Sequence, residues 1–272
     1  MTINCKGKLV DLSTPKVMGI LNTTPDSFYD GGTYKNEEDI LQQVEKMLND
    51  GATFIDVGGY SSRPGANHIS EEEEINRVVP VIKLLVEKFP DILISIDTFR
   101  SNVAEEAVNN GACVINDISG GKMNEQMFIT VAKLKVPYIM MHMKGNPQNM
   151  QQNPIYENVV TEVMSFFAEQ LFKLRALKVN DVLIDVGFGF GKTIEHNFEL
   201  LSKLTLFKQL DCPIVTGVSR KSMLYKTIDA TAKEALNATT VANTIALMNG
   251  THILRVHDVK EAVESIQIVN RI

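Results

Sequence analysis

The 272-residue sequence lacks the features of a membrane, secreted or metal-cluster protein. No apolar run approaches the roughly 18 residues that cross a bilayer, and the first residues lack the apolar segment of a signal peptide. The three cysteines, Cys5, Cys113 and Cys212, lie far apart and show no CxxC spacing for zinc or an iron–sulfur cluster. We therefore expect a cytoplasmic protein with reduced, mostly buried thiols.

The chain also has no excess of positive charge. Its 27 Lys and Arg residues against 33 Asp and Glu residues give a formal charge of -6. This balance offers no general attraction to nucleic acid or to an anionic membrane, so we expect neither as a partner. No low-complexity segment or block of one charge divides the chain, and 44% of its residues are hydrophobic. We predict a single domain over residues 1–272, with its core at about 17–263 and the first dozen residues peripheral.

Short runs of Val, Ile and Leu alternate along the chain with longer segments whose apolar residues recur at helical spacing. Eight runs are expected to be strands: residues 17–21, 54–57, 93–96, 114–115, 138–141, 182–184, 214–216 and 253–256. This spacing leaves about 34 residues per strand, close to the length of one β–α unit. Strands that are apolar on both faces are typical of parallel sheets covered by helices. The pattern favours an α/β fold, a closed (β/α)8 TIM barrel, over an open doubly wound sheet.

Helix starts give a second local signal. Ser70 is followed by four glutamates, which predicts an N-cap and an acidic first turn that suits the helix dipole, rather than a metal site. Ser101 is expected to cap a helix over residues 102–109 in the same way. The apolar stripe of residues 155–177 predicts a further helix.

The residues that follow the predicted strands are polar, and in barrel enzymes these positions line the active site. The first two strands lead into long glycine-rich loops, residues 22–32 and 56–65. The later strands end at or lead into Asp97, Asn116, His142, Asp185, residues 219–222 and residues 255–258. Asp and Asn after a strand commonly cap the next helix, and Asp117 and Asp258 are expected to do only that.

Cations at the strand ends predict an anionic ligand. Helix capping explains acids and amides there, but it does not explain Arg63, Lys221, Arg255 and His257. Helix N-termini already supply positive potential at these places. Together with backbone amides of the glycine-rich loops, the four cations suit phosphate or pyrophosphate.

Asp97, Asn116 and Asp185 form a second group, at the ends of the third, fourth and sixth predicted strands. They supply two carboxylates and an amide that both donates and accepts, which is the set needed to bind the edge of a heteroaromatic ring bearing an amino group and a ring N–H. A ring lacking those donors would leave carboxylates unpaired at a cost of about 1–3 kcal/mol each. We therefore expect a nucleobase-like ring.

Residues 187–193, GFGFGKT, imitate two nucleotide-binding motifs without matching either. The first glycine of a P-loop would fall at Val186, and the third glycine of the dinucleotide fingerprint would fall at Lys192. We interpret the segment as a flexible wall that offers Phe190 to an apolar or aromatic ligand. The alternative is an ordinary tight turn with a core phenylalanine. His142 has no partner at metal-ligand spacing.

Taken in order along one chain, these motifs resemble those of the dihydropteroate synthase family. The residues concerned are 18–28 (MGILNTTPDSF), 56–59 (DVGG), 61–65 (SSRPG), 116–118 (NDI), 185 with 187–189 (D, GFG), 219–222 (SRKS) and 255–257 (RVH). The resemblance covers about residues 17–263. It implies a barrel transferase of folate synthesis that joins 6-hydroxymethyl-7,8-dihydropterin diphosphate to 4-aminobenzoate and releases pyrophosphate. It also implies inhibition by sulfonamides, which mimic 4-aminobenzoate.

The resemblance assigns roles to individual residues. It implies catalytic roles for Lys221, Arg63, Arg255, Asp97 and Asp185. The pterin ring would contact Asp97, Asn116, Asp185 and Lys221, and the diphosphate would contact Arg63, Arg255 and His257. The 4-aminobenzoate pocket would comprise Ser62, Pro64, Phe190 and Ser222, and Met140 would be a further substrate-binding residue.

The resemblance also implies a cofactor and a partner. Asn22 would ligate a Mg2+ ion that arrives with the diphosphate, since Mg2+ usually keeps several waters and takes one or two protein oxygens plus phosphate. A homodimer is expected through helices near the C-terminal part of the chain, and residues 235–248 supply an apolar surface for it.

The sequence departs from the usual family pattern at three positions. Ser62, Val186 and Met223 stand where the family usually has Thr, Pro and Phe. Ser62 keeps the hydroxyl but loses a methyl group, and Met223 replaces a ring with a flexible thioether. None of the three removes a charged role, and the degree of sulfonamide sensitivity stays open.

Three other functions stay open at this point. A Schiff-base aldolase would also place a lysine such as Lys221 near the end of a barrel strand beside phosphate-binding loops. A pterin-binding methyltransferase that works with a corrinoid protein shares the barrel and the ring-binding acids, but it needs no diphosphate clamp, so Arg63 and His257 argue against it. The third is a binding protein that holds a pterin without turnover.

Overall fold

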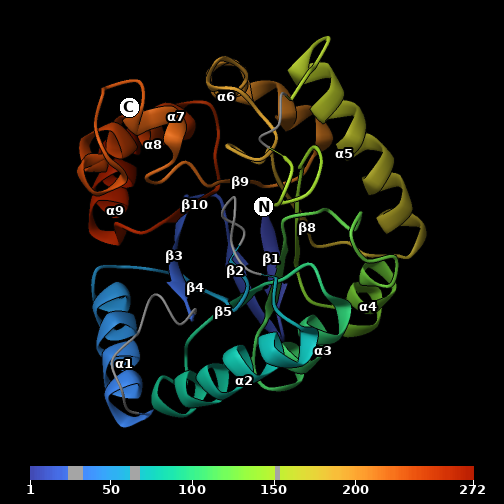
Figure 1. Cartoon of the computed structure of the whole chain (residues 1–272), viewed down its shortest axis with the longest axis vertical. Helices are drawn as coiled ribbons and strands as arrows, with labels where there is room; N and C mark the ends of the chain where they lie inside the picture. The colour runs from blue at the N-terminus through green and yellow to red at the C-terminus, as the bar shows by residue number, and fades with distance from the viewer. Residues whose placement is uncertain (24–32, 62–67, 151–153) are drawn as a thin grey trace.

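The eight predicted strands form a closed parallel barrel in the computed structural model, which describes residues 1–23, 33–61, 68–150 and 154–272. Around the barrel the strand order is β10-β3-β4-β5-β6-β7-β8-β9 (Figure 1). The bounds are β3 (Lys16–Asn22), β4 (Phe54–Gly58), β5 (Ile94–Asp97), β6 (Val114–Asp117), β7 (Tyr138–Met141), β8 (Val182–Asp185), β9 (Ile214–Thr216) and β10 (Ile253–Val256). The predicted (β/α)8 TIM barrel is therefore confirmed.

Helices alternate with the strands and surround the barrel (Figure 1). They are α1 (Thr33–Asn49), α2 (Glu71–Lys88), α3 (Ser101–Asn109), α4 (Met127–Leu134), α5 (Val159–Ala176), α6 (Ile194–Ser202), α7 (Ser222–Tyr225), α8 (Leu236–Met248) and α9 (Val259–Val269), with 3-10 turns η2 (Leu204–Leu210) and η3 (Ala232–Glu234). No helix in the described part of the chain is long and apolar enough to cross a membrane.

The predicted helix starts are partly correct. Ser70 caps α2 as expected, because its hydroxyl accepts a hydrogen bond from the Glu73 amide at 3.1 Å. Ser101 is the first residue of α3 rather than its cap, a position that Arg100 occupies. The helix predicted from residue 155 begins at Val159, because the side chain of Asn158 caps it.

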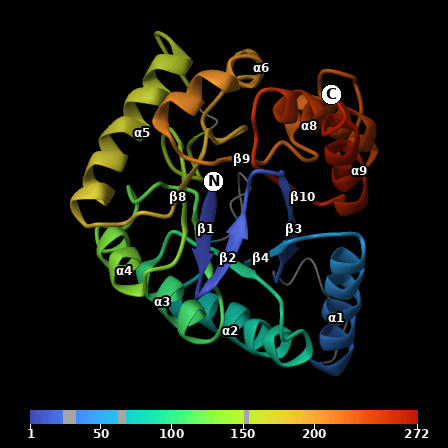
Figure 2. The same cartoon turned by 180° about the vertical axis from the view of Figure 1, so that it is seen from behind.

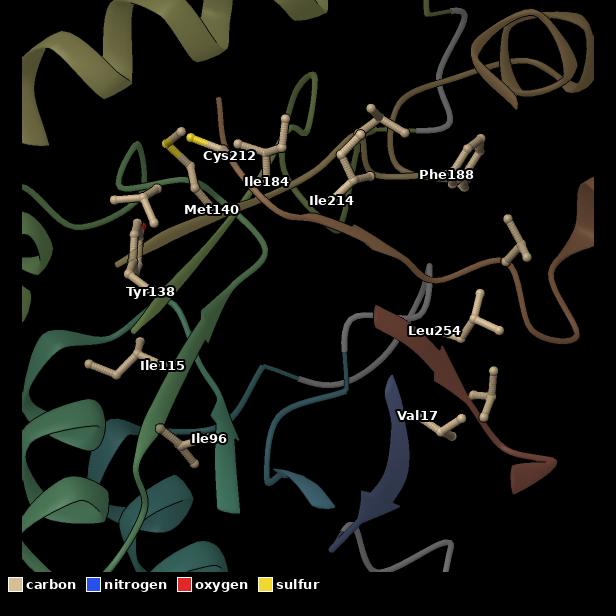
Figure 3. Close-up of a cluster of buried hydrophobic side chains, with 14 of the residues drawn as sticks. Val17, Ile96, Ile115, Tyr138, Met140, Ile184, Phe188, Cys212, Ile214 and Leu254 are labelled. Carbon is tan, nitrogen blue, oxygen red and sulfur yellow. The ribbon is translucent and has the colours of Figure 1, made fainter. Parts of the chain in front are cut away.

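Strand residues alternate between two apolar layers, as the pleat of a strand requires. One set faces the helices and packs against them in the large outer core, which includes Val17, Ile96, Ile115, Tyr138, Ile184 and Leu254 (Figure 3). The other set fills the interior of the barrel toward its amino-terminal end, and includes Met18, Phe54, Val114, Ile139, Leu183, Val215 and Ile253. The carboxyl-terminal end of the interior is left for polar side chains.

An antiparallel hairpin of β1 (Thr2–Cys5) and β2 (Lys8–Asp11) lies across the centre of the ring of helices (Figure 2). Its buried residues Ile3, Cys5, Val10 and Leu12 belong to the same cluster as the barrel interior. The Asn4 amide also donates to Asp181 Oδ2 at 3.1 Å. The expectation of a peripheral first dozen residues is therefore wrong, because the hairpin closes the amino-terminal end of the barrel.

The three cysteines are free and buried, in agreement with the sequence-based expectation. Cys5 lies on the hairpin and Cys113 lies just before β6, and both belong to the interior cluster. Cys212 lies in the outer core. All three therefore contribute apolar surface to the packing.

Replacing a hairpin residue that faces the barrel should lower stability. Ile3 is 2% exposed, so Ile3→Ala is expected to lower the free energy of unfolding by ~2–5 kcal/mol through lost burial and a residual cavity. Leu9, on the same hairpin, is 71% exposed, and Leu9→Ala should change that free energy by no more than ~0.5 kcal/mol. Urea unfolding of both variants measures the difference. Equal effects would show that the hairpin does not unfold with the barrel.

Candidate functional site

Two acids and one arginine form an ion-pair network at the carboxyl end of the barrel. Arg255, on β10, donates from Nε to Asp56 Oδ2 and from Nη2 to Asp97 Oδ2, each at 2.6 Å. Asn116, on β6, donates from Nδ2 to the same Asp56 Oδ2 at 3.1 Å. The network joins four strands across the mouth of the barrel, and it brings together the predicted residues Asp97, Asn116 and Arg255.

Asp56 has no predicted role beyond opening a loop motif, yet it is central to this network. It is fully buried on β4, and its Oδ1 atom has no hydrogen-bond partner among the described residues. Its neighbours Ile55 and Val57 lie in the outer core, so Asp56 faces the interior. An acid inside an otherwise apolar strand is the sequence signal that could have identified it.

Gly58 lies between Asn22 and Asp97, because it pairs with Asn22 on β3 and with Asp97 on β5. A Cβ atom at Gly58 would lie 3.8 Å from Asp97 Oδ2 and 3.9 Å from Asn22 Oδ1. The two oxygens therefore face the same space at the ends of β3 and β5. Asn22, predicted to bind a metal, lies beside the predicted pterin-binding acid.

A second convergence surrounds Gly217, just after β9. A Cβ atom there would lie 3.7 Å from Asp185 Oδ2, 3.9 Å from Lys221 Nζ and 3.9 Å from Arg255 Cβ. Lys221 Nζ also donates to the carbonyl oxygen of Phe188 and lies 4.7 Å from the centroid of the Phe190 ring. Residues from three distant parts of the sequence thus meet in one place.

Burial shifts the pKa values of three of these groups in the direction that favours their uncharged forms. Burial lowers the pKa of Lys221 to about 8, against the opposing charge of Asp185. Burial raises the pKa of Asp185, which Lys221 opposes. Burial likewise raises the pKa of Asp97, and Arg255 opposes that shift. The site therefore holds charges that are costly to bury, and a ligand that supplies matching donors or acceptors would stabilise them.

Two consecutive residues of the loop after β9, Ser219 and Arg220, pair with two consecutive residues that follow β10, His257 and Asp258. Ser219 Oγ lies 2.9 Å from His257 Nδ1 and accepts a hydrogen bond from the His257 amide at 3.2 Å. Arg220 makes a bidentate pair with Asp258, both bonds at 2.8 Å. Asp258 was expected only to cap a helix. It occupies the N-cap position of α9, but its carboxylate binds Arg220 instead.

Asp117 was likewise expected to cap a helix, and this prediction is wrong. Its carboxylate accepts hydrogen bonds from the Ser119 amide at 2.7 Å, the Gly121 amide at 2.9 Å and the Tyr138 hydroxyl at 2.8 Å. Asp117 faces away from the barrel interior and organises the loop that follows β6. It is therefore separate from the site.

Two of the four residues predicted for the 4-aminobenzoate pocket, Phe190 and Ser222, are among the described residues. Phe190 is half-buried and packs against a small cluster of Phe99, Ile118, Met141, Met143 and Met150. Ser222 is the first residue of α7 and directly follows Lys221. Ser62, Arg63 and Pro64 lie outside the described residues.

Met140, predicted to bind substrate, lies elsewhere. It is fully buried in the outer core against the helices (Figure 3). The next residue, Met141, has the opposite orientation and packs in the cluster beside Phe190. The role predicted for Met140 is therefore wrong, because its side chain faces the helices and successive side chains on a strand face opposite sides.

The remaining candidates for a metal site have structural roles. The glutamate run begins α2 as predicted, and Glu74 forms a buried ion pair with Arg100 at 2.7 Å. Within the described residues, no group of three or more His, Cys, Asp or Glu side chains could hold a metal ion. A resident metal held by such a cluster is therefore not supported there.

Comparison with known proteins gives a consistent result. Residues 18–257 match a family model described as pterin binding enzyme. The chain is 43% identical over 272 residues to the dihydropteroate synthase of Escherichia coli (strain K12), covering 99% of this chain and 95% of that protein.

Solved structures agree. A Yersinia pestis dihydropteroate synthase in complex with a sulfonamide drug superposes with a TM-score of 0.93 at 42% identity, covering 100% of this chain and 98% of that one. A Xanthomonas albilineans dihydropteroate synthase with 4-aminobenzoic acid gives a TM-score of 0.92 at 36% identity, covering 99% and 97%. With the same fold over nearly the full length and the charged groups gathered at the barrel mouth, this chain belongs to the dihydropteroate synthase family of transferases.

Proposed function

We propose that this chain joins 6-hydroxymethyl-7,8-dihydropterin diphosphate to 4-aminobenzoate, giving 7,8-dihydropteroate and pyrophosphate for folate synthesis. The observation that carries the proposal is the convergence of Asp97, Asp185, Lys221 and Arg255 at the carboxyl end of the barrel. The relatives solved with 4-aminobenzoic acid and with a sulfonamide drug support this choice of second substrate, and they support sulfonamides as inhibitors of this chain.

The acids would bind the pterin ring. Asp97, Asp185 and the amide of Asn116 come from three strands and offer acceptors for the ring N–H and amino groups. The Nζ atom of Lys221 would donate to an acceptor on the ring. The raised pKa values of both acids fit this role, because hydrogen bonds from the ring to the charged carboxylates would offset the cost of burying them.

The cations would bind the diphosphate. Arg255 and His257 lie at the end of β10, and Arg63 is proposed as a third member on the basis of the sequence motif. The bonds to Asp56 and Asp97 use two of the five N–H donors of the Arg255 guanidinium. The same arginine could therefore hold the acids in register and still donate to a phosphate oxygen.

In this mechanism the bond between the pterin methylene carbon and the diphosphate oxygen breaks, and pyrophosphate leaves with the electron pair. The arylamine nitrogen forms the new bond to that carbon and then loses a proton. No strong base is required, because an arylamine has a free lone pair at neutral pH. The cations stabilise the growing charge on pyrophosphate, while the two acids stabilise a ring that becomes positive, and such preorganised electrostatics is often the largest contribution to catalysis.

Asn22 would hold a Mg2+ ion that arrives with the diphosphate. The described residues offer one neutral amide oxygen there, near the carboxylate of Asp97. That donor set fits an ion which keeps most of its waters and takes its remaining ligands from the substrate. When bound, the ion would neutralise charge on the phosphate oxygens.

The chain is further proposed to be a single pterin-binding domain over residues 1–272 in the cytoplasm, where its three free thiols would stay reduced. Cell fractionation tests the compartment. A folded, active fragment lacking part of the barrel would contradict the single domain.

A coupled assay for pyrophosphate tests the function. With both substrates and Mg2+ present, pyrophosphate release is expected, and omitting 4-aminobenzoate or chelating Mg2+ should each lower the rate by at least ~10-fold. Pyrophosphate release at the same rate with and without 4-aminobenzoate would indicate hydrolysis of the diphosphate instead. Borohydride trapping of a Lys221 adduct with a carbonyl substrate would favour the aldolase alternative.

Removing the Lys221 ammonium should impair catalysis. Lys221→Ala is expected to lower kcat/KM by at least ~100-fold, about 2.7 kcal/mol, because it removes a preorganised charge from the site. Lys226→Ala is the matched control, since Lys226 is exposed five residues further on and should leave kcat/KM unchanged.

The pH profile gives a second measurement on Lys221. Because its pKa is lowered to about 8, the ammonium is charged below that pH and loses its proton above it. Wild-type kcat/KM should therefore fall as the pH rises through about 8. In Lys221→Arg this fall should move to higher pH, and an unchanged profile would remove Lys221 from the mechanism.

The apolar face of α8 is proposed as a homodimer interface. Val241, Ile245 and Met248 follow helical spacing on α8 and are exposed. Ile268, on the neighbouring helix α9, is exposed as well. An exposed apolar face of this kind commonly marks a protein–protein contact.

A charge on this face should disrupt the dimer. Sedimentation equilibrium should give about twice the chain mass of 30.2 kDa for the wild type. Val241→Asp should shift the distribution toward monomer, because a carboxylate would be buried in the interface. Ile129→Asp, at an exposed position on α4, is the control and should leave the mass unchanged. A wild-type monomer would contradict the proposal.

A further inference from the structure

Lys192 is a buried lysine in the segment that only imitates a phosphate-binding loop. Its side chain is 3% exposed, and Nζ lies within hydrogen-bonding distance of four polar atoms. These are the carbonyl oxygens of Gly187 at 3.0 Å, Phe190 at 3.1 Å and His142 at 3.3 Å, and His142 Nδ1 at 3.0 Å. A buried lysine usually pairs with a carboxylate. Here the hydrogen-bond partners are three backbone carbonyls and one imidazole, which is the arrangement of a clamp on the backbone.

The clamp joins the loops that follow two neighbouring strands. His142 follows β7, while Gly187 and Phe190 follow β8. The loops pack so closely that a Cβ atom at Gly187 would lie 2.0 Å from the His142 carbonyl oxygen, and Gly187 has a φ of +70°. Only glycine suits that position. The segment is therefore fixed at this end.

The middle of the segment is held from the other side. The Gly189 amide donates to Asn197 Oδ1, on α6, at 2.7 Å. Asn197 is itself buried, and its Nδ2 donates to the carbonyl oxygen of Thr193 at 2.6 Å. Residues 187–190 are thus bound on both sides, and the interpretation of this segment as a flexible wall is wrong.

The fixed segment presents two groups to the site. The carbonyl oxygen of Phe188 accepts a hydrogen bond from Lys221 Nζ, and the Phe190 ring lies 4.7 Å from the same nitrogen. The carbonyl of Phe190, whose ring meets Lys221, is one of the acceptors that Lys192 holds. Displacing that carbonyl would move the ring, and the ring is part of the proposed 4-aminobenzoate pocket.

We propose that Lys192 is a positioning residue for the second substrate: it holds the backbone carbonyl of Phe190 so that the Phe190 ring forms one wall of the 4-aminobenzoate pocket. This inference rests on the proposed function and deepens it. Lys192 acts through the loop, so the first substrate should be affected less, because the acids proposed for the pterin ring lie at the ends of strands.

Burial sets the charge states of the two side chains in this contact. Burial lowers the pKa of His142 to about 2, so its ring is neutral and Nδ1 can accept. Burial also lowers the pKa of Lys192 well below its usual range, against the opposing charge of Asp185. A charged Lys192 ammonium has three N–H donors and a neutral amine has two, so Nζ can hold at least two of the three carbonyls in either state.

Lys192→Met tests the proposal, because methionine fills similar space without a donor. The KM for 4-aminobenzoate is expected to rise at least ~10-fold, while calorimetry should give a Kd for the pterin diphosphate within about threefold of wild type. Lys203→Met, at an exposed position just after α6, is the matched control and should behave as wild type. An unchanged KM for 4-aminobenzoate, or an equal loss of affinity for both substrates, would overturn the inference.

A double-mutant cycle separates positioning from a general loss of structure. If Lys192 acts through Phe190, adding Lys192→Met to Phe190→Ala should change the KM for 4-aminobenzoate by less than about threefold. The same fold-change in both backgrounds would contradict the proposal. Asn197→Ser loosens the segment from its other side, so it tests the same idea even if Lys192→Met does not fold. It should raise the same KM, and no rise would count against the proposal.

The wild type is measured in the same assay, so two failures can be told apart. A wild-type protein that releases no pyrophosphate would contradict the proposed function. An active wild type with an unaltered Lys192→Met variant would contradict this inference alone.

Discussion

The bridge from Arg255 to Asp56 and Asp97 is the constraint on which the mouth of the barrel depends. A charge inside a closed barrel must be paired, because the surrounding apolar strands cannot solvate it. Arg255 donates to acids on two strands at 2.6 Å each. Asn116, on a third strand, donates to the same Asp56 oxygen that accepts from Arg255. The acids proposed to bind the ring and the arginine proposed to bind phosphate can thus occupy the same small space. In the proposed mechanism, each group would then be oriented before the substrate binds.

Most of the barrel follows from local patterns in the sequence. The eight strands are short apolar runs, and their spacing matches one β–α unit each, so the fold class is predictable from periodicity. The hairpin of β1 and β2 is not, because each strand has four residues and buries two at most, a pattern that becomes meaningful only against the open end of a barrel. Helix boundaries fail for a related reason. Ser and Asn both commonly cap helices, but Asn158 caps α5 whereas Ser101 is already inside α3. The path of the preceding chain decides whether such a residue takes the cap position.

The charged part of the site is predictable because its residues follow strands, and parallel strands bring their carboxyl ends together. The site predictions fail where they depend on which face of a strand a side chain occupies. Met140 and Met141 are chemically alike, and only the register of β7 decides that Met140 faces the helices while Met141 faces Phe190. Asp56 is overlooked because a motif that begins at its position suggests a loop, whereas the residue is the inward-facing acid of a strand. The predicted limits of both strands, residues 54–57 and 138–141, are nearly those observed, so what the sequence lacks is which side of each strand faces the barrel interior.

The two substrates would therefore bind to parts of the protein that are held in place in different ways. The proposed pterin site is built from strand ends that the barrel hydrogen bonds fix directly, whereas the proposed 4-aminobenzoate pocket depends on a loop that Lys192 and Asn197 hold. The two departures from the family pattern that the structure describes, Val186 and Met223, are fully buried in the outer core. Both supply apolar side chains to that core, and neither removes a charged group from the site. Substitutions that loosen this loop should accordingly affect the second substrate more than the first, because the strand ends of a closed barrel keep their place when the loop shifts.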